Sequence, residues 1–96
     1  MWKISIEKIR DLVRELVLED KYRINWAHIF ERGHGITERE IRLVLLHGRH
    51  ERDKVREDRF VAFGRPPPDY RNLRVVYTFF ERGGEIMLFI VTAFVD

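Results

Sequence analysis

The stretch that most constrains the fold is residues 73–95, which read LRVVYTFFERGGEIMLFIVTAFV. Two runs rich in β-branched and aromatic residues flank a short connector whose glycines, Gly83 and Gly84, supply the positive φ angles of a tight turn. This pattern predicts a β-hairpin. The second run is apolar at every position from 86 to 91, which is typical of a strand covered on both faces. We therefore expect helices on one side of the hairpin and more protein on the other.

Three helices are predicted in the first half of the chain. In the first, apolar residues recur at steps of three and four between positions 6 and 17, after Ser5 as the cap and before an end near residue 19 or 20. A short second helix is predicted over residues 26–32, ended by glycines at 33 and 35. The third begins with a capping box formed by Thr37 and Glu40, and Gly48 closes it.

Strand signals follow the third helix. Residues 50–59 are polar and charged and predict a frayed strand or a loop, whereas residues 60–64 predict a strand. The prolines in residues 65–69 require an exposed connection, because proline lacks the backbone donor that a sheet needs. The predicted fold class is therefore α+β, with three N-terminal helices packed on a three- to four-stranded antiparallel sheet, in one domain over residues 1–96.

Composition limits the classes of function. The net charge is only +2, but the 18 basic residues comprise 14 arginines and 4 lysines. Arginine's planar fork suits phosphate, which favours an RNA or DNA partner; the alternative is a genome or habitat that favours arginine everywhere. The absence of cysteine excludes disulfides and thiolate metal sites. Without a signal-peptide core or the ~20-residue apolar run of a membrane helix, we expect a cytoplasmic protein that does not engage a membrane.

Short motifs spread over most of the chain resemble a widespread bacterial and archaeal domain family of unknown function. Its members read roughly YRITxHAxxRMxxRGIxxxEI, and the matching segments here are residues 9–13, 22–24, 26–27, 35–41, 46–48, 71–76 and 90–92. That family is similar to the RelE and BrnT toxins and to the wider barnase–EndoU–colicin–RelE group. The resemblance implies helices on one face of an antiparallel sheet, metal-independent ribonuclease activity and a cognate antitoxin as partner.

The sequence departs from this pattern at positions that bear on catalysis. Trp26 stands where the family has a histidine, Phe30 and His34 stand where it has arginines, and Phe94 stands where a tyrosine is common. His28 and Arg32 lie close by on the same helix, and they replace the lost groups if the register is shifted by two residues.

Cleaving RNA without a metal requires a base, an acid and a cation near the phosphate. His28 and Arg32 are spaced i and i+4, so they form either a base-and-clamp pair or an ordinary surface pair, unless His28 is buried against the sheet. His34 lies between two glycines, where it is either a functional group or a residue tolerated in a turn. Arg74 is predicted on one side of the hairpin with Val76, Thr78 and Phe80, where it binds phosphate or is merely solvated.

Further RNA contacts are predicted around the proline segment. Arg59, Arg65 and Arg71 form a rim that follows phosphates, and Tyr70 stacks a base. The histidines lack zinc-ligand spacing, so no metal or cofactor is expected. Two hypotheses remain: a RelE-like ribonuclease or its RNA-binding descendant, and a catalytically inactive assembly module that forms a homodimer through its sheet.

Overall fold

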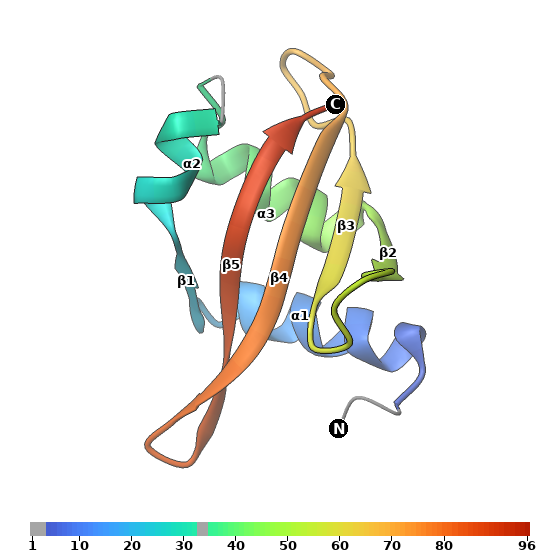
Figure 1. Ribbon diagram of the computed structural model, residues 1–96, viewed down its shortest axis with the longest axis vertical. Helices are drawn as coiled ribbons and strands as arrows, with labels where there is room; N and C mark the ends of the chain where they lie inside the picture. The colour runs from blue at the N-terminus through green and yellow to red at the C-terminus, as the bar shows by residue number, and fades with distance from the viewer. Residues whose placement is uncertain (1–3, 33–34) are drawn as a thin grey trace.

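The computed structural model describes residues 4–32 and 35–96. One five-stranded sheet has the strand order β1-β5-β4-β3-β2, with α1 and α3 on one face and α2 beside β5 (Figure 1). In chain order the elements are α1 (Ile6–Leu18), β1 (Tyr22–Ile24), α2 (Trp26–Arg32), α3 (Glu38–His47), β2 (Arg49–Arg52), β3 (Phe60–Gly64), β4 (Leu73–Arg82) and β5 (Glu85–Val95).

The C-terminal hairpin is confirmed. Strands β4 and β5 pair antiparallel from Leu73 opposite Val95 to Arg82 opposite Glu85. At the tip, Gly83 and Gly84 have φ angles of 59° and 82°. Two consecutive positive φ angles are what a two-residue turn requires to match the twist of its strands, and glycine adopts them without strain.

The predicted start of the first helix and both predicted ends of the third are also confirmed, whereas the predicted end of the second helix at Gly33 lies outside the described residues. The Ser5 side chain accepts a hydrogen bond from the Lys8 amide at 3.3 Å, and the capping box of Thr37 and Glu40 is complete. Gly48 follows the last residue of α3, where a Cβ atom would lie 2.3 Å from the carbonyl oxygen of Phe63. Glycine is therefore required there by the close approach of β3, in addition to ending the helix.

The α+β class is confirmed, but the expected three- to four-stranded antiparallel sheet is wrong, because the sheet has five strands and is mixed. The short segment β1 pairs parallel with β5, from Tyr22 opposite Leu88 to Ile24 opposite Ile90. The polar stretch after α3 also contributes β2, which pairs antiparallel with β3. As an edge strand, β2 tolerates the charged residues that concealed it in the sequence.

The core lies between the helices and one face of the sheet. It contains Leu73, Val75, Tyr77 and Phe79 from β4, and so confirms the predicted alternation along that strand. The expectation that the hairpin is covered on both faces is wrong for the described residues, because helices pack on one face only (Figure 1). The other face carries the candidate site, and the loop after β2 reaches its edge, where the Asp58 carbonyl oxygen accepts a hydrogen bond from the Thr78 hydroxyl.

Candidate functional site

The face of the sheet opposite α1 and α3 has an apolar middle and charged residues at its edges, and we call this surface the open face. In Figure 1 it faces the viewer, with α1 and α3 behind it. Val61 and Val76 are only 9% and 8% exposed although neither belongs to the core cluster. The open face comprises Val61, Phe63, Arg74, Val76, Thr78, Phe80, Met87, Phe89, Thr92 and Phe94, with Arg49 and Glu51 at its β2 edge, Arg23 at its β1 edge, and Arg82 and Glu85 at the hairpin tip.

One row across four strands of the open face alternates arginine and phenylalanine. Arg49 is opposite Phe63, Phe63 is opposite Arg74, and Arg74 is opposite Phe94. The guanidinium carbon of Arg49 lies 5.0 Å from the centre of the Phe63 ring. That of Arg74 lies 5.3 Å from the Phe63 ring and 5.2 Å from the Phe94 ring. These cation–π contacts hold the arginines over the rings, and we call the four residues the arginine–phenylalanine row.

Each arginine of the row has one carboxylate partner. Arg74 lies 3.3 Å from Asp96, and Arg49 lies 2.7 Å from Glu51. The two arginine side chains are 41% and 70% exposed, so these pairs contribute at most about 1 kcal/mol each. The Nε atom of Arg74 is buried and has no hydrogen-bond partner among the described residues. An incoming phosphate can therefore displace either carboxylate.

Two shallow hollows flank the row. One, of about 490 Å³, lies towards the proline segment and joins Arg65 to Arg49, Arg74 and Asp96. The other, of about 330 Å³, lies towards the loop after β2 and adds Arg52 and Lys54. The fold thus brings Arg65 and Arg74, which were predicted separately, to the same hollow.

The other predicted residues of the proline segment are held in different ways. Arg65 donates from Nε to the Tyr70 carbonyl oxygen at 3.1 Å, and Tyr70 is 58% exposed. Arg71 donates to both carboxylate oxygens of Glu40, each at 3.2 Å, which ties this segment to α3. Arg59 lies at the end of the loop before β3, partly exposed. The Tyr70 side chain is therefore exposed, and its stacking role remains a prediction, whereas the Arg71 guanidinium is engaged by the fold.

The ion pair of Arg71 involves a buried carboxylate, since Glu40 is only 3% exposed. Burial would raise the pKa of Glu40, but the hydrogen bond from the Thr37 amide and the Arg71 guanidinium together outweigh it and hold this pKa below its usual value. The Glu40 carboxylate is therefore charged at neutral pH, which leaves the Arg71 guanidinium a structural partner.

The predicted catalytic residues are only partly described. His28 lies partly buried on α2, and no hydrogen bond or ion pair joins it to Arg74 in the described part of the chain. Arg32 is the last residue of α2, but its side chain is not described, and His34 lies outside the described residues. The pairing of His28 with Arg32 and the role of His34 remain predictions, and Arg74 is the one predicted catalytic residue that lies in the row.

A buried histidine on the helix side of the sheet was not singled out by the sequence. His50 Nδ1 lies 2.7 Å from the Tyr77 hydroxyl oxygen, and Nε2 lies 3.0 Å from the Leu45 carbonyl oxygen. Because a carbonyl only accepts, Nε2 carries the proton and Nδ1 accepts from the Tyr77 hydroxyl. Burial is the main cause that lowers the pKa of His50 to about 4. This histidine is therefore neutral at pH 7, and its two hydrogen bonds join β2 to α3 and to β4.

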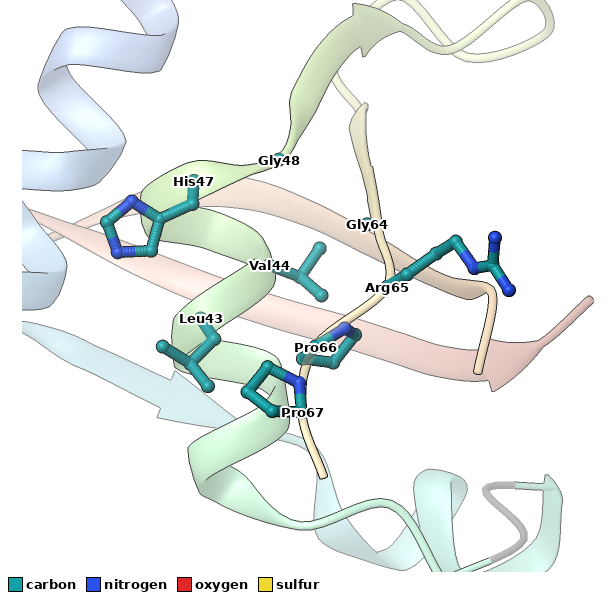
Figure 2. A pocket seen from close by; sticks show the side chains of 8 residues that line it. All are labelled: Leu43, Val44, His47, Gly48, Gly64, Arg65, Pro66 and Pro67. Carbon is teal, nitrogen blue, oxygen red and sulfur yellow. The ribbon is translucent and has the colours of Figure 1, made fainter. Parts of the chain in front are cut away.

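A third hollow, of about 220 Å³, lies between the end of α3 and the proline segment (Figure 2). Leu43, Val44, Pro66 and Pro67 line it with apolar surface. In Figure 2 the side chains of His47 and Arg65 extend to opposite sides of this hollow. Without polar groups that converge, it lacks the features of a catalytic pocket.

Within residues 4–32 and 35–96, no group of three or more His, Asp or Glu side chains is arranged to hold a metal ion. None of the helices in this part of the chain has the length and apolarity that a membrane crossing requires. Comparisons with protein-family models, curated proteins and solved structures found no match. The resemblance to RelE-like toxins therefore stays a prediction from the sequence, and the functional argument depends on the geometry of the open face.

Proposed function

We propose that this protein is an RNA-binding descendant of the RelE-like toxins, which binds single-stranded RNA on its open face. The observation that carries the proposal is the arginine–phenylalanine row, with two guanidinium groups over two aromatic rings at the surface of a sheet. Single-stranded RNA is bound by aromatic rings that stack its bases and by cations that contact its phosphates. Both kinds of group alternate along this row.

The hollow beside the row supports the same proposal. Arg49, Arg65 and Arg74 line it together, so a phosphate there would meet three guanidinium groups. Exposed carboxylates neutralise Arg49 and Arg74 in the free protein, and phosphate replaces them at little cost because surface ion pairs are weak. Single strands suit the row better than duplexes, since only unpaired bases can stack on its guanidinium and aromatic groups.

Binding without cleavage is the form of this function that the row supports. Metal-independent cleavage needs proton-transfer groups near the bound phosphate, and arginine and phenylalanine supply none at neutral pH. His50, the histidine nearest to the row in sequence, is on the helix side of the sheet and hydrogen-bonded to Tyr77. A cognate antitoxin, which the resemblance implies, remains a predicted partner.

The decisive experiment measures the affinity of a labelled uridine oligonucleotide for the protein by fluorescence anisotropy in EDTA over a range of salt concentrations. Arg74→Ala is expected to weaken binding about tenfold and to lower the salt slope by about 0.7, the value for one phosphate contact on a single strand. Phe63→Leu keeps the apolar contact but removes the ring, and it is expected to weaken binding by about 1–3 kcal/mol.

The matched control is Arg39→Ala, which removes the same charge from an exposed position on α3, away from the open face. Equal losses for Arg74→Ala and Arg39→Ala would show that only net charge matters and would end the proposal. The same mixtures, analysed on a denaturing gel, should contain intact RNA. Fragments that appear with the wild type and not with Arg74→Ala would restore the ribonuclease hypothesis. An equal affinity for the matching DNA oligonucleotide would remove RNA as the specific ligand.

A further inference from the structure

We propose that the open face is also a homodimer interface, on which a second copy of this chain packs its own open face and so covers the arginine–phenylalanine row. The dimer itself does not depend on the proposed function. Its consequence does: if the row binds RNA, the dimer and the RNA-bound protein exclude each other.

The apolarity of the open face is the first argument. An antiparallel sheet with one face in water normally alternates apolar and polar residues along each strand. Here seven open-face residues on β3, β4 and β5 are apolar, namely Val61, Phe63, Val76, Phe80, Met87, Phe89 and Phe94, and the charged residues of these strands lie at the two ends of the face. Apolar surface of this extent, rimmed by polar residues, is typical of a protein interface.

The half of the open face nearest the hairpin tip suits protein better than nucleic acid. Phe80 and Phe89 pack edge to face, with ring centres 6.4 Å apart. Among the described contacts, no arginine lies over either ring, in contrast to Phe63 and Phe94 at the other end. The cations of this half, Arg23 opposite Phe89 and Arg82 opposite Glu85, lie at its edges. Its apolar middle therefore suits the same apolar side chains of a second copy better than phosphate.

The size of the open face is the second argument. From Met87 to Phe94 the face is roughly 23 Å long; it is four strands wide at the row, roughly 20 Å, and three strands wide nearer the tip, roughly 15 Å. This gives a footprint of roughly 400 Å² per copy. Because corrugated side chains expose more area than their footprint, two copies bury on the order of 1,200 Å² together, which reaches the lower range of specific interfaces.

Charge complementarity identifies the partner as a second copy. The row end of the face carries Arg74 with Asp96, and the hairpin tip carries Arg82 opposite Glu85. A two-fold axis that runs the strands of the two copies antiparallel places the tip of each copy near the row of the other, so that cations and carboxylates meet at both contacts. The net charge of +2 adds little repulsion between copies.

The test measures the mass of the wild-type protein by sedimentation velocity at increasing concentrations, together with three variants. Met87→Glu and Met87→Lys place charges of opposite sign in the apolar half, and each is expected to weaken the dimer at least 100-fold. Leu18→Glu makes the same kind of change at a side chain that is 67% exposed on α1, outside the open face, and should leave the dimer unchanged. Circular dichroism establishes that each variant is folded.

A cross-link provides a test that does not depend on weakening the interface. The chain has no cysteine, so Thr92→Cys places a single thiol on the open face, and Leu18→Cys places one outside it. Packed sheets lie about 10 Å apart, so a short bifunctional maleimide should join two Thr92→Cys chains and leave Leu18→Cys monomeric. A monomeric wild type at every concentration, or an equal cross-link yield for both cysteine variants, would overturn the dimer.

Adding the uridine oligonucleotide separates the two proposals. The dimer fraction of the wild type should fall as RNA is added, and the monomeric Met87→Glu variant should bind RNA at least as tightly as the wild type. A dimer that persists when RNA is bound would overturn the mutual exclusion. A folded, monomeric Met87→Glu variant without RNA affinity would overturn the proposed function and leave the dimer standing.

Discussion

Lowering the pH from 7 to 5 is expected to destabilise this protein through His50. The neutral imidazole donates from Nε2 to the Leu45 carbonyl and accepts at Nδ1 from the Tyr77 hydroxyl. Protonation at Nδ1 removes the acceptor that the Tyr77 hydroxyl uses and adds a charge to a side chain that is 7% exposed. The nearby Arg14 and Arg10 disfavour that charge further.

The size of the effect follows from the difference between folded and unfolded pKa values. In the unfolded chain His50 has the ordinary pKa of 6.5, whereas in the folded protein the pKa is about 4, chiefly because of burial. The unfolded state therefore binds the proton first as the pH falls. The stabilisation is complete above pH 6.5 and is lost progressively down to pH 4. Between pH 7 and pH 5 the loss is about 2 kcal/mol, and below pH 4 it levels off at about 3 kcal/mol.

Urea unfolding at pH 7 and pH 5, followed by circular dichroism, measures this loss. The wild type should lose about 2 kcal/mol more than His50→Gln, whose amide does not titrate but still offers a donor and an acceptor. His47→Gln, at an exposed histidine on the end of α3, should retain the wild-type pH dependence. The same pH dependence in wild type and His50→Gln would refute this reasoning, as would an NMR titration of the folded His50 near pH 6.5.

Three further predictions concern the stability of the fold. Thr37→Ala removes the capping box of α3, and urea unfolding should show a loss of about 1 kcal/mol. Gly48→Ala places a Cβ atom 2.3 Å from the Phe63 carbonyl oxygen, so it should lower the melting temperature by about 10 °C or prevent folding; an unchanged melt would contradict the close packing of α3 on β3. Arg71→Met removes two hydrogen bonds to Glu40 and should cost about 2 kcal/mol at pH 7 in urea. Because the folded pKa of Glu40 is lowered, that loss should shrink as the pH falls below about 4, and a pH-independent loss would show that the ion pair is not its cause.

Features set by neighbouring residues could be predicted from the sequence. The capping box of Thr37 and Glu40 is complete, and the glycines of the hairpin tip have the expected positive φ angles. The alternation of β4 also follows from sequence, because successive side chains of any strand point to opposite faces. These features depend on a few adjacent positions, and tertiary contacts reinforce them without changing them.

Features that depend on distant pairing could not be predicted. Strand β1 has three residues, and its partner in β5 lies more than sixty residues further along the chain, so no local signal marks it as a strand. The arginine–phenylalanine row is a further case. Arg49, Phe63, Arg74 and Phe94 lie in four separate segments, and only the register of three strand pairs brings them side by side.

A bulge in β5 decides which face Phe94 joins. Ile90 pairs with Tyr77 and Thr92 pairs with Val76, so Val91 is an extra residue between two consecutive partners. Before the bulge the Ile90 side chain lies in the core, and after it the Ala93 side chain does. These two positions are three apart, whereas regular alternation places core residues two or four positions apart. A continuous alternation would have turned Phe94 towards the helices. One inserted position, whose carbonyl oxygen accepts a hydrogen bond from the Asn25 side chain at 3.3 Å, therefore completes the row on the open face.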